Sequence, residues 1–255
     1  MHPEMLYSDL LARAHEVLEA RLSAASRKEN GATTTLEGDP VTISPASAST
    51  SDSGPTTPNP HTAFGQSIKD WPLFPDTYQA LRTLAQHYKL VVLSNIDHTS
   101  FSHTHPQLSE GATASSPTLY SYPHPNPHQY WFPQTTPGSK SPFTLILTAQ
   151  DTKCYKPAPG ALSTALGCIQ KDPALLDAPE SDDAKDQVLM VAQSLYHDIV
   201  PSSRLGMKSV WIDRKGACMG LETPKGGARW TWRFETLGEL AEAVQREVEV
   251  ANRPQ

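Results

Sequence analysis

The sequence predicts a three-layer α/β fold, in which helices cover both faces of a parallel sheet. Two observations predict it. Helix-like and strand-like segments alternate from about residue 71 to the C-terminal end, which is the order that builds parallel sheets. The strand-like segments are short, continuous apolar runs, as is typical of strands covered on both faces. In such Rossmann-like sheets the ligand lies beyond the carboxyl ends of the strands, so we expect the function there.

The first expected element is an amphipathic helix over residues 5–22. Its apolar residues recur at steps of three and four, namely Leu6, Leu10, Leu11, Ala14, Val17, Leu18 and Leu22. Residues 26–62 consist mainly of Ser, Thr, Pro and Gly. They lack the large apolar side chains of a packed core, so we expect a disordered low-complexity insertion there.

The core elements are expected in two blocks, residues 63–101 and 143–250. In chain order they are a helix from Pro75 to about Lys89, a strand over 90–93, a strand over 143–148, a helix over 159–169, a strand over 188–192, a short helix over 199–205 ended by Gly206, a strand over 209–212, and a last helix that Thr236 and Glu239 begin as a capping box. Between the blocks, residues 102–142 are rich in His, Pro, Ser and Thr. We expect this insertion to be largely irregular, although its Tyr and Trp residues favour docking onto the domain.

Composition excludes several classes of function. The net charge of −6 and the scattered Lys and Arg residues argue against a nucleic-acid partner. No apolar run is long enough to span a membrane. The three Cys residues form no C-x-x-C motif, which favours reduced thiols and a cytoplasmic location. We therefore expect a soluble cytoplasmic protein that acts on a small molecule, and a homodimer is compatible with this expectation.

Polar side chains follow three successive predicted strands. Ser94 and Asn95 follow the first, Lys156 lies in the loop after the second, and Asp198 follows the third, after Gln193 and Ser194. Each alone has a simpler structural explanation, such as a turn, a solvated charge or a helix cap. Their order at the strand ends instead favours one site in which a hydroxyl, an ammonium and a carboxylate surround a small anion.

Three segments around these residues resemble the second, third and fourth motifs of the haloacid dehalogenase superfamily, and most of all fungal type II haloacid dehalogenase-like proteins. The segments are VVLSNID (91–97), CYKPAPGAL (154–162) and VLMVAQSLYHDIVPSSRLGMKSVWIDRKG (188–216). The resemblance covers about residues 70–100 and 143–245, and residues 1–25 resemble the first helix of that family's cap. It implies a fold like that of the superfamily. It also implies that Lys156 and Asp198 are catalytic and that Ser94, Asn95, Gln193 and Ser194 bind the substrate.

The first motif of the superfamily is not found in the sequence. In this family an aspartate at the end of the first strand attacks the substrate and forms an ester that water then hydrolyses. No such segment precedes the helix expected over 5–22. A weak internal candidate, residues 95–99, carries an amide where the nucleophile should stand. We therefore expect a truncated product that catalyses the reaction roughly 10⁴ to 10⁶ times more slowly than an enzyme that has the nucleophile.

The fourth motif favours one reaction. Metal-dependent phosphatases of the superfamily usually carry two acids there, whereas this sequence carries only Asp198. This favours hydrolytic dehalogenation of a small 2-haloacid through an aspartyl ester, without a cofactor. The alternatives are a phosphatase of the same superfamily, which would use Mg²⁺, and a catalytically dead protein that acts by binding or dimerisation. The histidines in and just before the second insertion, His98, His103, His105, His124 and His128, are expected in a solvated loop and not at a metal site.

Overall fold

The computed structural model describes residues 5–29, 59–111, 117–172, 175–176, 183–217, 221 and 229–253. The chain divides into two compact units, of which the smaller comprises Tyr7–Ile68 and the larger comprises Met1–Leu6 with Lys69–Gln255. The smaller unit pairs a long helix, α1 (Tyr7–Glu29), with a short one, α2 (Pro60–Gln66), and a 3₁₀ turn (Ser67–Asp70) follows α2.

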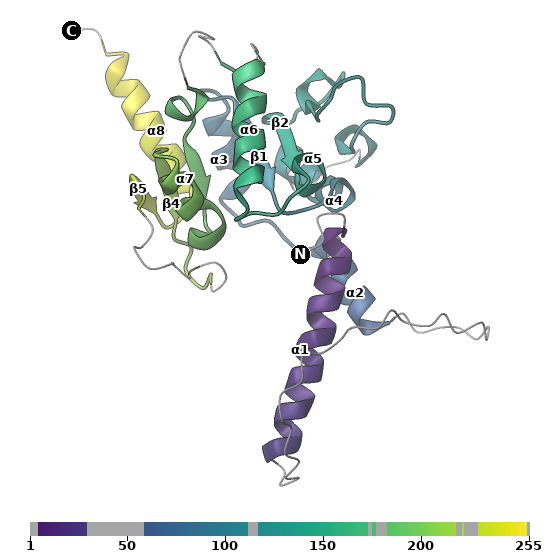
Figure 1. The fold of residues 1–255 in the computed structure, drawn as a ribbon. Helices are drawn as coiled ribbons and strands as arrows, with labels where there is room; N and C mark the ends of the chain where they lie inside the picture. The colour runs from purple at the N-terminus through teal and green to yellow at the C-terminus, as the bar shows by residue number, and fades with distance from the viewer. Residues whose placement is uncertain are drawn as a thin grey trace. The chain divides into compact units, whose positions relative to one another are not determined.

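The larger unit is a mixed structure of helices and parallel strands (Figure 1). Its helices and strands are α3 (Thr77–Leu84), β1 (Leu90–Ser94), α4 (His98–Glu110), β2 (Phe143–Thr148), α5 (Ala149–Thr152), α6 (Pro159–Lys171), β3 (Met190–Ala192), α7 (Val200–Arg204), β4 (Ser209–Ile212), β5 (Trp232–Phe234) and α8 (Leu237–Ala251). A π-helical turn (Leu195–Ile199) connects β3 to α7. The predicted α/β class with parallel strands is therefore confirmed.

The strands form two ladders where the sequence predicts one sheet. β1 pairs with β2, and β3, β4 and β5 pair in that order. Among the described residues, β1 and β3 therefore each have one edge without a partner strand. As a result β1 is only half-buried along its length and Val191 of β3 is 37% exposed. The expectation that these two strands are fully covered is wrong, because an unpaired strand edge leaves part of its side chains open.

Helices pack on β4, which has a strand on each side, and on β2, which pairs with β1 and also contacts Trp131 of the second insertion. On β4, Val210 and Ile212 face α3 and α8, while Trp211 packs on the π-helical turn on the opposite face. On β2, Leu145 and Leu147 pack against α6. This alternation follows from the two-residue period of a strand, and it produces the buried apolar runs that the sequence shows.

The second insertion is more ordered than its composition predicts. Residues 102–110 belong to α4, because the Asp97 side chain caps this helix by accepting a hydrogen bond from the Ser100 N–H at 2.7 Å. Tyr120 and Trp131 are 0% and 1% exposed. The predicted docking of the aromatic residues is therefore confirmed, whereas the expectation of a largely irregular stretch is wrong for α4.

Two of the histidines expected in a solvated loop pack against other side chains, which corrects a second expectation. His105 is fully buried, and His98 stacks on the Tyr122 ring with the ring centroids 3.8 Å apart. The His105 Nδ1–H donates to the Tyr120 carbonyl at 3.0 Å, because a carbonyl can only accept. The Ser141 hydroxyl then donates to Nε2 at 2.8 Å. The imidazole is thus a neutral, satisfied core group.

The first low-complexity stretch differs from its predicted bounds at both ends. Helix α1 continues through residues 26–29, and α2 begins at Pro60 with Asn59 as its cap. The rest of the predicted insertion, residues 30–58, lies outside the described residues.

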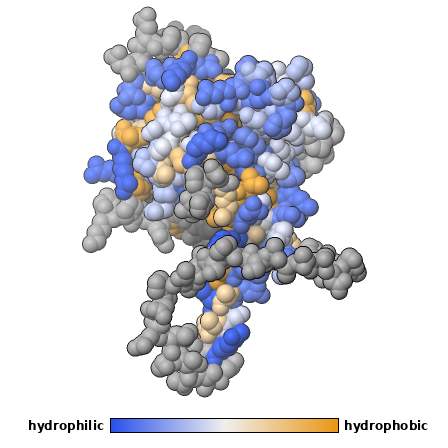
Figure 2. Space-filling model, turned by 45° about the vertical axis from the view of Figure 1, so that its right-hand side comes forward, coloured by the Kyte–Doolittle hydropathy of each residue, from blue (hydrophilic) through white to orange (hydrophobic). Residues whose placement is uncertain are grey.

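None of the helices in the described part of the chain combines the length and the hydropathy that crossing a bilayer requires. The face drawn in Figure 2 shows hydrophilic residues interspersed with small hydrophobic patches.

Candidate functional site

The centre of the candidate site is an ion pair between Lys156 and Asp198. The Lys156 Nζ lies 2.6 Å from Asp198 Oδ1 and donates a second hydrogen bond, also 2.6 Å long, to the Leu93 carbonyl of β1. The two side chains are only 13% and 10% exposed. Because burying charges costs free energy unless they are paired, this arrangement requires that each partner compensate the other.

The backbone around Lys156 is held by Asn95. The Asn95 Oδ1 accepts from the Lys156 N–H at 2.7 Å, and Asn95 Nδ2 donates to the Lys156 carbonyl at 2.9 Å. This reciprocal pair joins the end of β1 to the loop that precedes α6. The geometry thus makes Asn95 a residue that positions Lys156, whereas the sequence assigned it to substrate binding.

Asp198 is placed by the π-helical turn. Ser194 caps this turn, since its Oγ accepts from the His197 N–H at 3.1 Å and lies 2.9 Å from His197 Nδ1. Leu195 and Ile199 anchor the turn on Trp211. The turn therefore directs the Asp198 carboxylate toward Lys156.

A small hollow lies beside the ion pair, near the end of β1 and the start of β3. Leu93 and Met190 contribute its walls from the two strands, and Lys156, His197 and Asp198 contribute its polar groups. It has room for about one water molecule. Among the described residues that line it, Asp198 is the only acidic one.

The remaining predicted site residues lie near this hollow but do not line it. Ser94 ends β1 opposite Thr148, and its hydroxyl forms no hydrogen bond with any part of the chain that the structure describes. The Gln193 carbonyl accepts from Trp211 Nε1 at 3.0 Å, and the Ser194 hydroxyl is engaged with His197. The structure thus brings together Lys156, Asp198 and Asn95, and it leaves the Ser94 hydroxyl open to a ligand.

A second polar pair at the strand ends was not found from the sequence. The His98 Nε2 lies 2.9 Å from both carboxylate oxygens of Asp151, which is 4% exposed. Burial acts to raise the pKa of Asp151, but the hydrogen bonds from His98 and from the Thr148 N–H outweigh it and bring the pKa below its usual range. The sequence did hold a signal for this pair, because His98 follows β1 and Asp151 follows β2.

Comparisons with known proteins give low similarity only. No family model and no curated protein matches the sequence. A solved structure described as a dehalogenase is 18% identical, with a TM-score of 0.46. The match covers 72% of this chain and 61% of the dehalogenase chain. A HAD phosphatase from Thermococcus onnurineus is 18% identical, with a TM-score of 0.42, and covers 70% of this chain and 61% of its own.

An L-2-haloacid dehalogenase from Xanthobacter autotrophicus, solved with chloropropionic acid covalently bound, is 14% identical, with a TM-score of 0.48, and covers 74% of this chain and 68% of its own. The chain thus spans about three fifths of the length of the first two structures. A likeness of this size establishes neither a family nor an activity for the chain.

Proposed function

We propose that the chain is a haloacid dehalogenase-like hydrolase that acts on a small anionic substrate, a 2-haloacid, near the end of β1. The observation that carries the proposal is the buried ion pair of Lys156 and Asp198 beside a hollow that Leu93 of β1 and Met190 of β3 flank. The open Ser94 hydroxyl lies at the tip of β1 and supplies a donor for the substrate carboxylate. The motif resemblance of the surrounding segments supports the same assignment.

The proposed reaction needs a carboxylate nucleophile. Its oxygen attacks the carbon that carries the halogen, the carbon–halogen bond breaks, halide leaves, and water then hydrolyses the ester. Lys156 balances the clustered negative charge, and Asn95 holds Lys156 in place. Asp198 is the only acidic residue lining the hollow among those described, and Lys156 already pairs with it. We therefore propose that this chain turns over roughly 10⁴ to 10⁶ times more slowly than a protein with a nucleophilic aspartate in the hollow.

Because slow turnover is expected, the decisive experiment measures binding. Isothermal titration calorimetry of the full chain with 2-chloropropionate and with inorganic phosphate is carried out with and without Mg²⁺. Halide release is assayed from 2-chloropropionate, and phosphate release is assayed from a phosphate monoester. We expect 2-chloropropionate to bind without Mg²⁺. Ser94→Ala should weaken it by about tenfold or more, since a hydrogen bond to a charged group contributes roughly 1.5–3 kcal/mol. Lys156→Met should weaken it at least as much.

Matched controls come from the same unit. Lys208 is exposed and lies outside the hollow, and Ser203 lies on α7 away from it, so Lys208→Met and Ser203→Ala should bind like the unmodified chain. Mg²⁺-dependent release of phosphate, without halide release, would replace the dehalogenase proposal by the phosphatase alternative. A cooperatively folded protein that binds neither anion would refute both and favour a binding or dimerisation protein.

A further inference from the structure

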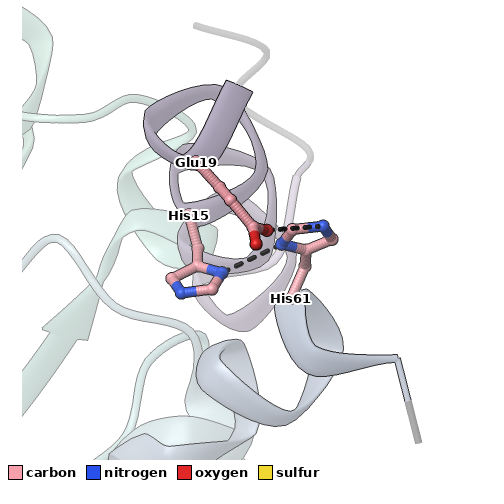
Figure 3. Close-up of side chains that lie close together, drawn as sticks. All are labelled: His15, Glu19 and His61. Carbon is pink, nitrogen blue, oxygen red and sulfur yellow. Dashed lines mark hydrogen bonds and ion pairs between the residues drawn. The ribbon is translucent and has the colours of Figure 1, made fainter. Parts of the chain in front are cut away.

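We propose that the smaller unit binds one divalent transition-metal ion of the zinc type through His15, Glu19 and His61 (Figure 3). His15 and Glu19 lie four residues apart on α1, a spacing that puts both on one face of a helix. His61 comes from the first turn of α2. In Figure 3 the two imidazole rings and the carboxylate point toward one another.

The distances between the three side chains suit a shared ion. His15 Nδ1 lies 2.9 Å from His61 Nδ1, whereas the other ring nitrogen, His61 Nε2, lies 3.6 Å from Glu19 Oε2. One ligand atom from each side chain lies within 4.8 Å of the others. Zinc bonds of about 2.0–2.1 Å at tetrahedral angles place neighbouring ligand atoms about 3.3 Å apart. Because an ion takes one nitrogen from each ring, ligand atoms up to 4.8 Å apart need to shift by no more than about 1.5 Å to reach this spacing, and the exposed Glu19 side chain can supply part of that movement.

The donor set selects the kind of ion. Two imidazole nitrogens favour Zn²⁺, Cu²⁺ or Ni²⁺ over Mg²⁺ and Ca²⁺, which prefer oxygen ligands. Two His and one Glu leave the fourth tetrahedral position to water.

The two helices hold the ligands close to their positions. A Cβ on Gly65 would lie 2.1 Å from the Ser8 carbonyl oxygen, so only glycine allows α2 to approach α1 this closely. Asn59 fixes the start of α2 by accepting from the His61 N–H at 2.9 Å. The Phe64 ring stacks on the His15 imidazole with centroids 4.6 Å apart. A ring of α2 thus orients the His15 imidazole of α1, and the cap of α2 fixes the backbone of His61.

The smaller unit has little else to hold it together. Among its described residues only Gly65 and Ile68 are buried, whereas Val17, Leu18 and Leu22 of α1 are 44%, 55% and 59% exposed. Units without a sufficient apolar core are commonly stabilised by a bound metal or another cross-link. A metal that joins α1 to α2 would supply that link across the 46 residues that separate His15 from His61.

The test uses the full chain after treatment with a chelator. Zn²⁺ is titrated by calorimetry, and Co²⁺ is titrated with its visible absorption as a report of tetrahedral geometry. We expect one equivalent to bind, with release of protons, because imidazoles bind metals only when deprotonated. His61→Gln and Glu19→Gln should each weaken Zn²⁺ binding by at least about tenfold, since even the loss of an outer-shell partner typically costs 10- to 100-fold.

Controls separate this site from general surface binding. Glu16→Gln removes an exposed acid from the same helix, and His103→Gln removes an exposed histidine from α4, so both should leave the affinity unchanged. Gly65→Ala removes no ligand but should weaken binding, because it pushes α2 away from α1. Glu19 is exposed, so Glu19→Gln should leave the helix pair intact and keeps the test interpretable if a histidine variant misfolds.

Three outcomes would overturn the proposal: no binding of Zn²⁺ or Co²⁺, equal affinity in Glu19→Gln and Glu16→Gln, or unchanged affinity after His61→Gln. In any of these cases the cluster is only a hydrogen-bonded imidazole pair. Lys156→Met lies in the other unit and should not change Zn²⁺ binding. The result is therefore independent of the proposed hydrolase function.

Discussion

Replacing Lys156 by Met should destabilise the larger unit more than the loss of an ordinary surface charge. The substitution leaves the Asp198 carboxylate, 10% exposed, without its partner at 2.6 Å. It also leaves the Leu93 carbonyl without the second hydrogen bond from the ammonium. Breaking a buried ion pair by removing one partner costs about 3–5 kcal/mol. Because both side chains keep some contact with water, we expect a loss of roughly 2–4 kcal/mol in the free energy of unfolding.

A double-mutant cycle tests whether this loss comes from the pair. Asp198→Leu alone leaves the Lys156 ammonium buried with only the Leu93 carbonyl as a partner, and should also cost roughly 2–4 kcal/mol. The double variant, Lys156→Met with Asp198→Leu, buries no unpaired charge. Its cost should therefore be smaller than the sum of the single costs by at least about 1 kcal/mol.

The assay is urea unfolding followed by tryptophan fluorescence. All five Trp residues lie in the larger unit, so the signal reports the unit that contains the pair. Lys208→Met, an exposed control, should stay within about 0.5 kcal/mol of the unmodified chain. Single costs that add up within about 0.5 kcal/mol in the double variant would refute the coupling. Equal unfolding midpoints for Lys156→Met and Lys208→Met would refute the burial argument.

Three further predictions concern the rest of the larger unit. Burial lowers the pKa of His105 from 6.5 to about 4, so from about pH 6.5 down to about pH 4 the unfolded chain binds a proton that the folded chain does not. Stability should fall by roughly 2–4 kcal/mol across that window, and urea titrations of His105→Gln should show a weaker pH dependence. The hydrogen bonds from Arg214 to Asp76, both 2.9 Å long, hold the pKa of the Asp76 carboxyl below its usual range against the opposing effect of burial. Asp76→Asn should therefore cost about 1–3 kcal/mol at neutral pH, and acid titration should show this cost shrinking as the pH falls below the ordinary aspartate range. Trp131→Ala should cost about 3–5 kcal/mol in thermal unfolding if the second insertion is part of the core, since the Trp131 side chain is 1% exposed; a cost below about 1 kcal/mol would show that the insertion only rests on the domain.

Continuous apolar runs made several elements predictable from the sequence. The strand predicted over 143–148 is β2, and the strand predicted over 209–212 is β4. Thr236 caps α8 by accepting from the Glu239 N–H, as the capping motif predicts. The Glu239 side chain, however, reaches the Glu235 N–H and not that of the cap. The local sequence pattern therefore predicts where these elements begin and end, but it does not predict the hydrogen-bond partner of each side chain.

Long-range contacts explain what the sequence could not show. The order of polar residues at the strand ends indicated that Lys156 and Asp198 meet. It could not show that both ends of the Asn95 amide bind the Lys156 backbone 61 residues away. Similarly, the polar composition of residues 102–110 argues against a helix, but the Asp97 cap and the buried Phe101 and His105 on its inner face stabilise one.

The unpaired edges of β1 and β3 have a practical consequence for handling the protein. These edges present backbone N–H and C=O groups sideways, although the Leu93 carbonyl already bonds the Lys156 ammonium. An extended peptide, including one from a second molecule, gains ladder hydrogen bonds by lying along such an edge. Concentrated samples should therefore lose material to self-association through strand addition while each remaining molecule keeps its native packing.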